Sequence, residues 1–212
     1  MEKLVIVGAG GFGREVEWLV KRINKINPTY EVIGYADDEK AIGEEIGYSK
    51  VICTTDELIT TEEDLNVTIA IGNAKVRKML AEKLSTNTHL KFPNLIDPSV
   101  IYDNEETMLG KGNIICANTI MTVNIKIGNF NIINLDCTIG HDDVLNNYIT
   151  IYPSVNVSGC VVVDDIVEIG TGTQIIQGLK ICSNTIIGAS AAVVKSIEES
   201  GTYVGVPVKR IK

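Results

Sequence analysis

The segment His141-Asp142-Asp143 contains residue types suited to general-base chemistry. An imidazole titrates near neutral pH, so it can take a proton from an amine or a hydroxyl that attacks a carbonyl. A neighbouring carboxylate can orient the ring and raise its basicity, and the sequence leaves open whether Asp142 or Asp143 does so. The alternative is an incidental exposed histidine beside solvated acids, and spacing alone does not separate the two for His141. His89, which lies among polar residues at the end of a predicted helix, is interpreted as a surface histidine.

A glycine-rich turn near the N-terminus is the second segment with recognisable chemistry. Gly8-Ala9-Gly10-Gly11-Phe12-Gly13 follows the apolar run 4–7 and precedes a helical pattern over 14–23. In this context the glycines allow backbone N–H groups to approach a phosphate at the positive end of a helix. A second predicted strand, over 31–36, ends at Asp37-Asp38, where an acid could hydrogen-bond a ribose hydroxyl. The alternative is a turn that only packs helix on strand, beside a solvated acidic loop.

The elements around this turn predict a parallel sheet flanked by helices. Short strands are expected near 51–52 and over 67–71, a helical turn over 56–59, and a helix that begins after Gly72-Asn73 and runs to 84. The pattern ends near Lys91, which leaves room for one mononucleotide-binding half, whereas a dinucleotide site normally needs two. A nucleotide or nucleotide-linked ligand is therefore favoured over NAD, and an NAD-dependent oxidoreductase is disfavoured.

A repeat of six residues organises the rest of the chain. Every sixth residue from 109 to 193 is aliphatic: Leu109, Ile115, Met121, Ile127, Ile133, Ile139, Leu145, Ile151, Val157, Val163, Ile169, Ile175, Ile181, Ile187 and Val193. Neither a helix nor an alternating strand has this period. Short strands separated by turns do, and stacking them buries one side chain per repeat in a parallel β-helix. His141 falls two positions after an inward-facing residue, at a corner, where its side chain points outward.

We therefore predict two domains and a fold class of α/β plus all-β solenoid. A small Rossmann-like nucleotide-binding domain is expected over 1–96 and a β-helix domain over 97–212, with the boundary in the proline-bracketed segment 92–98. Residues 102–108 break the repeat, as an irregular first coil would.

Composition limits the partners. The net charge of −8 over 212 residues argues against nucleic acid, and an aromatic content of only 5% fits an aliphatic core. Five cysteines without paired spacing indicate reduced thiols in a cytoplasmic protein, and no metal is expected with only two histidines. No apolar run suits a signal peptide or membrane insertion.

The whole chain resembles the PglD/NeuD family of bacterial sugar acetyltransferases. The resemblance rests on the glycine turn 8–13, on Asp37-Asp38, and on three further segments: Ile69-Ala70-Ile71-Gly72-Asn73, Ile139-Gly140-His141-Asp142 and Val204-Gly205-Val206-Pro207-Val208-Lys209-Arg210.

Membership would imply a left-handed β-helix and a homotrimer that binds acetyl-CoA in the groove between chains. His141 would be the general base, supported by Asp142, a position often held by glutamate in the family. The resemblance also implies residues that contact acetyl-CoA: Thr150, Gly159, Thr171, Ala189 and Lys209. Among these, Gly159 would be the backbone donor to the thioester carbonyl, and Lys209 belongs to a basic C-terminal patch. The residues implied for the sugar nucleotide are Gly10, Gly11, Phe12, Asp37, Asp38 and Gly72.

Residues and resemblance together predict acetyl transfer from acetyl-CoA to a nucleotide-linked amino sugar of the 4-amino-4,6-dideoxy type, in surface-glycan synthesis. O-acetylation of a sugar hydroxyl, as in the sialic-acid branch, would use the same base. A non-catalytic nucleotide-binding or scaffold protein is the alternative of another class. The sequence does not identify the nucleotide base.

Overall fold

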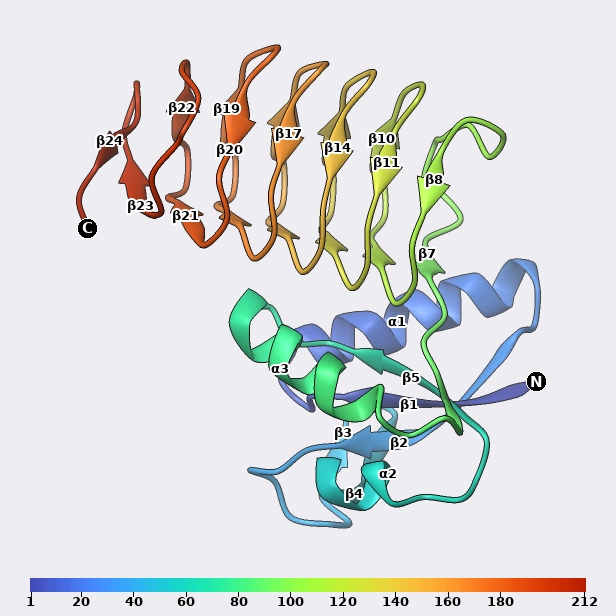
Figure 1. Ribbon diagram of the computed structural model, residues 1–212. Coiled ribbons are helices and arrows are strands. Elements are labelled where there is room, and N and C mark those ends of the chain that lie inside the picture. The colour runs from blue at the N-terminus through green and yellow to red at the C-terminus, as the bar shows by residue number, and fades with distance from the viewer.

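The computed structural model describes residues 1–212 and contains an α/β region followed by a solenoid, here the coils from Leu95 onward (Figure 1). The elements of the α/β region are β1 (Glu2–Val7), α1 (Gly11–Ile26), β2 (Tyr30–Ala36), β3 (Glu45–Ile46), β4 (Ser49–Cys53), α2 (Thr55–Ile59), β5 (Leu65–Ile69), α3 (Ala74–Leu84) and β6 (Leu90–Lys91). They form one sheet in the order β3-β4-β2-β1-β5-β6, parallel except for the β3–β4 pair.

The sequence-based outline of this region is confirmed in its main elements and incomplete at the sheet edges. The strand expected over 67–71 lies at Leu65–Ile69, so Ala70 and Ile71 belong to the loop that leads into α3. Two additional strands, β3 and β6, have only two residues each. Strands this short have no periodicity to detect, because alternation needs at least four residues.

The solenoid consists of short strands that stack on three faces, in parallel except for the last pair, β23 and β24. Its strands are β7 (Leu95–Ile96), β8 (Met108–Leu109), β9 (Ile114–Ile115), β10 (Ile120–Met121), β11 (Lys126–Ile127), β12 (Ile132–Ile133), β13 (Thr138–Ile139), β14 (Val144–Leu145), β15 (Thr150–Ile151), β16 (Asn156–Val157), β17 (Val162–Val163), β18 (Glu168–Ile169), β19 (Gln174–Ile175), β20 (Lys180–Ile181), β21 (Thr185–Ile187), β22 (Ala192–Val193), β23 (Gly201–Val204) and β24 (Lys209–Arg210). The three sheets are β10-β13-β16-β19-β22, β20-β17-β14-β11-β8 and β24-β23-β21-β18-β15-β12-β9-β7.

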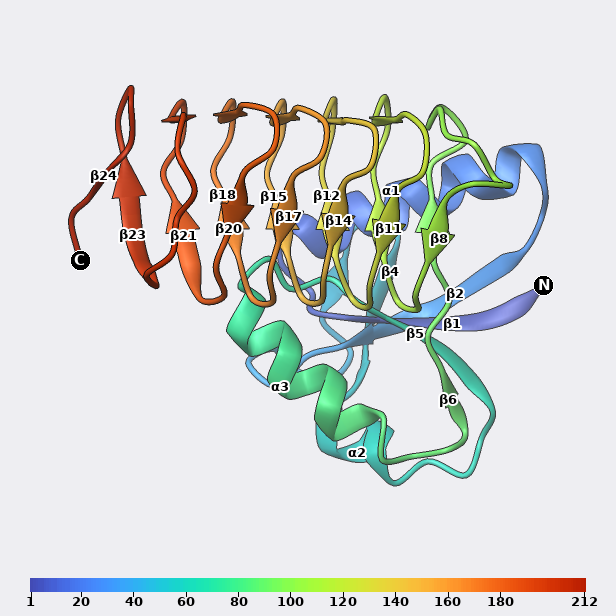
Figure 2. The ribbon, with the colours of Figure 1, turned by 45° about the horizontal axis from the view of Figure 1, so that its top comes forward.

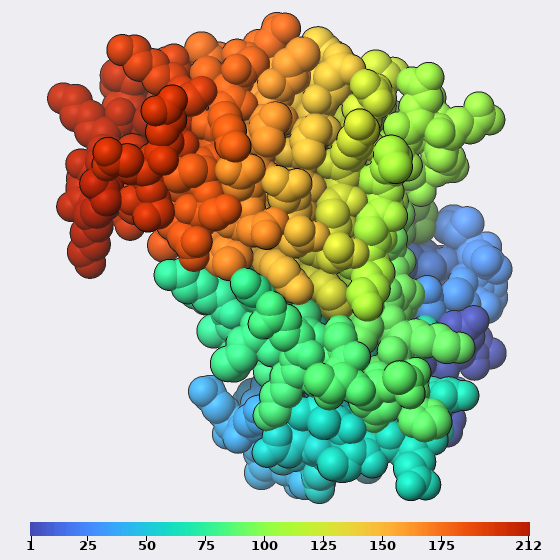
Figure 3. Space-filling model, in the orientation of Figure 1, coloured from blue at the N-terminus to red at the C-terminus, as the bar shows by residue number.

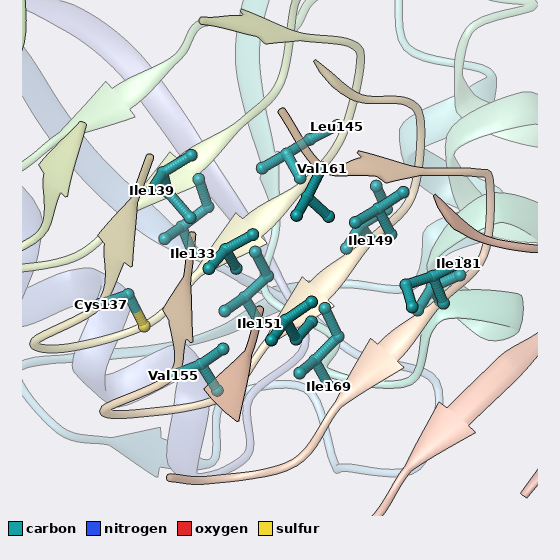
Figure 4. Close-up of a cluster of buried hydrophobic side chains, with 14 of the residues drawn as sticks. Ile133, Cys137, Ile139, Leu145, Ile149, Ile151, Val155, Val161, Ile169 and Ile181 are labelled. Carbon is teal, nitrogen blue, oxygen red and sulfur yellow. The ribbon is translucent and has the colours of Figure 1, made fainter. Parts of the chain in front are cut away.

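Register explains why the sequence repeat has a period of six. Each strand pairs with the strand three repeats later, so Ile133 lies beside Ile151 and Ile139 beside Val157. One coil is thus three hexads. Fourteen of the fifteen repeat positions are buried, and Leu109 at the N-terminal end is partly buried. Their side chains point toward one another along the axis of the prism, as Figure 4 shows for Ile133, Ile139, Leu145, Ile151, Ile169 and Ile181 among its labelled residues. This part of the prediction is confirmed.

The α/β region lies along one sheet of the solenoid, the eight-stranded sheet with β7 at one edge and β24 at the other. Helices α1 and α3 lie against this sheet (Figures 1 and 2). Leu95, Ile114 and Ile132 of that sheet belong to the same buried cluster as Val16, Leu19 and Val20 of α1. The strand at Leu95–Ile96 pairs with β9, so pairing within the solenoid already begins there. The last coils extend beyond the α/β region (Figure 3). None of the three helices has the length and apolar character needed to cross a bilayer.

Candidate active site

His141 lies in the corner between β13 and β14, with Asp142 beside it. The imidazole Nδ1 is 2.8 Å from Asp142 Oδ2, and the two side chains are 49% and 48% exposed. Asp142 takes the left-handed conformation, with φ of 62°. Aspartate tolerates this conformation better than most residues, and the corners of the neighbouring coils use it as well. The corner therefore turns the carboxylate back toward the ring.

A second contact holds the other carboxylate oxygen. Asn124, one coil earlier, donates from Nδ2 to Asp142 Oδ1 at 2.6 Å. The hydrogen bond with His141 contributes most to holding the pKa of Asp142 below its ordinary value, and the hydrogen bond from Asn124 adds to this effect. Asp142 therefore stays ionised where an imidazole titrates. Asn124 was not predicted as a site residue. Its separation from Asp142 by three hexads places the two residues at equivalent corners of successive coils, and this spacing was the available indication.

The two aspartates have different environments. Asp143 is completely buried and accepts from Val161 N at 2.8 Å and from Gly140 N at 3.0 Å. Its carboxylate does not contact the ring. The question left open by the sequence thus has a geometrical answer: Asp142 orients the imidazole.

Gly159 lies directly against the imidazole from the next coil. A Cβ atom built on Gly159 would come within 2.5 Å of His141 Nε2 and 2.7 Å of Cδ2, so any side chain at position 159 would displace the ring from this place. Its backbone N–H has no hydrogen-bond partner within the chain. The site thus combines an imidazole, whose Nδ1 is held by a carboxylate, with an unpaired backbone N–H on the glycine that lies against the ring.

Cys160 adds a thiol to the same corner. Its Sγ lies 4.0 Å from both His141 Nδ1 and Asp142 Oδ2. The three side chains form the one group in the chain whose donor atoms are close enough to hold a metal ion, all lying within 4.8 Å of one another.

The other residues implied for acetyl-CoA do not gather around His141 within one chain. Thr171 and Ala189 are exposed and lie at the corners that follow β18 and β21, the width of one sheet away, and Lys209 is exposed in β24. Thr150 is buried on the face that meets the α/β region, and its hydroxyl donates to Gly72 O at 2.6 Å. Thr150 and Gly72 therefore contact each other rather than an open groove. The sequence could not show this, because it does not reveal which face of the solenoid is covered.

The glycine turn has the predicted strand–turn–helix geometry. Gly10 precedes α1 without a side-chain cap, and Gly10 and Gly11 are exposed. A Cβ on Gly13 would lie 2.0 Å from Gly8 O, so helix and strand approach too closely for any side chain. Phe12 is half-buried and packs on the core cluster beneath α1, which leaves its backbone for a ligand.

Asp37 and Asp38 are both tied into the fold. Asp37 accepts from Ala9 N at 2.7 Å, which joins it to the glycine turn. Asp38 accepts from Thr55 N and Oγ1, both at 2.7 Å, and so anchors the start of α2. Burial alone would raise the pKa of Asp38, but the hydrogen bonds from Thr55 outweigh it and lower that pKa.

Two pockets flank the glycine turn. One, of about 250 Å³, has Asp37 and Asp38 on one side and the apolar Ile71, Val76 and Met79 on the other. The second, of about 330 Å³, lies over Gly10 and Gly11 and includes Arg14 and Lys40. A flat base suits the first and a phosphate suits the second, because the second has cations beside a helix N-terminus. Neither Arg14 nor Lys40 was predicted from the sequence as part of this pocket.

Comparison with known proteins gives consistent matches. A family model described as the PglD N-terminal domain matches residues 3–84. A GDP-perosamine N-acetyltransferase of Escherichia coli O157:H7 is 31% identical over 179 residues, which cover 82% of this chain and 78% of that protein.

Several solved structures cover the full chain, and two of them illustrate the match. The acetyltransferase domain of PglB from Neisseria gonorrhoeae superposes with a TM-score of 0.92 at 27% identity, covering 100% of both chains; that domain has also been solved with acetyl coenzyme A. WeeI from Acinetobacter baumannii gives a TM-score of 0.87 at 30% identity, also covering 100% of both chains. The predicted fold class, an α/β region followed by a parallel β-helix, is confirmed.

Proposed function

The chain belongs to the PglD-like family of hexapeptide-repeat sugar acetyltransferases, and from this premise we propose that it transfers the acetyl group of acetyl-CoA to the amine of a nucleotide-linked 4-amino-4,6-dideoxy sugar. The observation that carries the proposal is the arrangement of His141 between Asp142 and Gly159. Acetyl-CoA as the donor is supported by the Neisseria domain, which was solved with it.

In the proposed reaction the sugar amine attacks the thioester carbonyl carbon. Asp142 accepts the hydrogen on Nδ1 of His141, which leaves Nε2 free to take the proton from the attacking nitrogen. The N–H of Gly159 donates to the carbonyl oxygen as negative charge develops there, a contribution that is often the largest in acyl transfer. The C–S bond then breaks, and the leaving CoA thiolate takes the proton from Nε2 of His141, which restores the neutral base. No protein nucleophile and no metal take part.

Acetyl-CoA would lie in a groove between two chains of a homotrimer. Within one chain, His141 and Gly159 are separated from Thr171 and Ala189 by the width of a sheet. A second copy that packs its corner beside His141 would bring both sets to one ligand. Lys209, exposed near the C-terminus, would then be available to a CoA phosphate. Thr150 is omitted from this site because its hydroxyl is bonded to Gly72.

The nucleotide would occupy the two pockets beside the glycine turn. The diphosphate would lie over Gly10, Gly11 and the backbone of Phe12, and the base or ribose would lie against Asp37 and Asp38. We propose GDP as the nucleotide, because the E. coli relative is named for GDP-perosamine and carboxylates pair well with the adjacent N–H donors of guanine. Gly72 would contribute through the loop that Thr150 holds. Such a substrate fits cytoplasmic surface-glycan synthesis.

The test is mass-spectrometric detection of acetylated product from acetyl-CoA and a panel of GDP-, UDP- and dTDP-linked 4-amino-4,6-dideoxy sugars. We expect one added acetyl group on the GDP-linked sugar, and a loss of roughly 10²–10⁴-fold in kcat/KM for His141→Ala. The matched control is His89→Ala, since His89 is an exposed histidine that also contacts an aspartate, Asp64. Acetyl-CoA binding without product from any amine would contradict the proposal and direct the search to hydroxyl acceptors.

A further inference from the structure

One row of the hydrogen-bond ladder between coils has a single interruption, and it lies immediately before His141. Along the row from Gly110 to Ile176, the N–H that follows each inward-facing residue donates to the carbonyl of the inward-facing residue in the next coil, as Gly128 does to Leu145 and Asn146 to Val163. Gly140 is the exception. Its N–H does not donate to Val157 and is bonded to Asp143 Oδ2 at 3.0 Å instead.

The residue four positions after each repeat residue also faces inward, and these residues form a second row, to which Asp143 belongs. Asp143 differs from the other polar residues in this second row. Asn113 and Asn131 each accept a backbone N–H from the next coil and donate to a carbonyl of that coil, Gly128 O and Asn146 O respectively. Both bonds of these asparagines therefore join one coil to the next. Asp143 also accepts from the next coil, at Val161 N, but its second oxygen holds its own turn. An ionised carboxylate has acceptors only, which is why it can take both N–H groups.

We propose that Asp143 is a positioning residue for the acetyl transfer: its buried carboxylate takes the Gly140 N–H out of the ladder and so sets the peptide that carries His141 against Gly159. The inference rests on the function proposed above. Gly140 is packed tightly enough for this to matter, because a Cβ there would lie 2.4 Å from Gly159 N. The orientation of the Gly140 peptide thus controls how His141 lies relative to the proposed oxyanion donor, and a misplacement of about 1 Å can cost roughly 100-fold in rate.

The charge of Asp143 should affect the pH dependence. The titratable groups near it are His141 and Asp142 on its own turn, Cys160 on the next coil and Lys126 on the preceding one, whose backbone N–H donates to Asp143 O. Burial raises the pKa of Asp143 to about 7, against the hydrogen bonds from Val161 and Gly140. The carboxylate therefore loses its charge as the pH falls through the range in which an imidazole also protonates. If both must be deprotonated, the acidic limb of log kcat/KM has a slope of about 2 rather than about 1.

The experiment measures kcat, KM and pH profiles for wild type, Asp143→Asn and Asp143→Thr. Threonine occurs in the same row at 119, 173 and 185, so the second variant suits the coil even if the first does not fold. We expect kcat to fall about 10-fold or more, KM for both substrates to stay within about 2-fold, and the acidic limb to lose one unit of slope. The control is Thr119→Val, which removes one buried hydrogen bond of the same row, to Asn134 O. It should lower the melting temperature and leave the slope unchanged.

Each outcome decides the proposal. A wild-type slope of about 1, or variants that keep kcat/KM within about 2-fold, would overturn it, and the first of these needs no variant. Lower activity with an unchanged slope would show that Asp143 only stabilises the coil, which also overturns it. If the wild type acetylates no acceptor, the proposed function itself fails. The function and the role of Asp143 can fail separately. If the wild type is active, His141→Ala is inactive and Asp143→Asn has normal activity, the proposed function stands and only the role of Asp143 is rejected.

Discussion

His141 is oriented by residues that stacking brings from three coils to one corner. Asn124 and Asp142 are one coil apart, and Gly159 lies one coil beyond His141. A coil spans three hexads, so equivalent corners lie above one another at the spacing of neighbouring β-strands. The candidate site is therefore built on regular backbone and not on a long loop. This regular backbone holds the hydrogen bonds that run from Asn124 through Asp142 to the imidazole.

Gly159→Ala should displace the imidazole without unfolding the coil. The added methyl would lie 2.5–2.7 Å from three ring atoms, and a side chain at an exposed corner can rotate away. We expect kcat/KM to fall by roughly 100-fold, as for other small misplacements of catalytic groups, with a nearly unchanged melting temperature. Ser183→Ala serves as the control, because Ser183 holds the same hexad position as Gly159 but lies on a different edge of the solenoid. Activity near the wild-type value would show that the ring does not have to lie against Gly159.

Asn124→Ala and Asp142→Ala should reduce activity to different degrees. Asp142 contacts the ring directly, so its loss should cost roughly 10- to 100-fold in kcat/KM. Asn124 acts only through Asp142, and its loss should cost a few-fold. The double variant should resemble Asp142→Ala alone, because the two residues form one chain of hydrogen bonds. Additive losses in steady-state kinetics would contradict this coupling.

At the scale of the element, the solenoid depends on aliphatic side chains that no single coil can bury. Ile133, Ile151 and Ile169 lie in register on successive coils and are completely buried. Each covers its neighbours in the next coil, so stability accumulates from coil to coil. Backbone hydrogen bonds between coils follow the same register, and the interruption at Gly140 stands out against it.

Ile169→Ala should lower the free energy of unfolding by about 2–5 kcal/mol, the usual range for a buried isoleucine truncated to alanine. Ile26→Ala, at the end of α1 where the side chain is 77% exposed, should change it by less than about 0.5 kcal/mol. Denaturant unfolding at matched protein concentration measures both. Equal effects would mean that the prism interior is not the core of the protein.

For the whole molecule, polar contacts fix how the α/β region lies on the solenoid. Arg77 of α3 is buried and donates to Phe130 O of the solenoid and to Ile71 O and Gly72 O of its own loop. Burial lowers the pKa of Arg77 to about 10, so it remains charged at neutral pH. Glu168 of the solenoid accepts from Ala74 N at the start of α3. The loop that contains Gly72 is thus held from both sides.

The contact between Arg22 of α1 and Asp97 should make stability depend on acid pH. Asp97 is buried and accepts from Arg22 at 2.5 and 2.9 Å. Burial alone would raise the pKa of Asp97, but the hydrogen bonds from Arg22 and Ser99 outweigh it and lower that pKa. The stabilisation is therefore present above the ordinary carboxyl pKa and is lost as the pH falls through the lowered value.

We accordingly expect Asp97→Asn to lower the free energy of unfolding by about 1–2 kcal/mol at pH 7 and to match wild type near pH 2. Melting temperatures across that range provide the measurement. Glu63→Gln, which removes an exposed ion pair with Lys3, is the control and should have little effect. A difference for Asp97→Asn that stays constant with pH would show that charge is not its cause.

Local patterns predicted the fold because each depends on residues close in sequence. The hexad repeat determined which residues face the axis, and the glycine turn 8–13 with its flanking apolar run and helical pattern predicted the strand–turn–helix geometry. The corner position of His141 follows from the same repeat. What the patterns missed, the short strands β3 and β6 and the buried Arg77, depends on neighbours far along the chain. Arginine at the helical spacing of Ala74, Leu80 and Ala81 was the available indication.

The amino-acid sequence was enough to predict a stacked β-helix with a histidine at one corner and a glycine turn suited to a phosphate. The folded chain was needed to show which aspartate is hydrogen-bonded to the ring, that Thr150 is bonded to Gly72, and that Asp143 interrupts the ladder. The physical reason is that a repeat specifies the direction of a side chain, whereas a hydrogen bond requires a partner within about 3 Å. For these residues, partner and burial are supplied by another coil or by the α/β region.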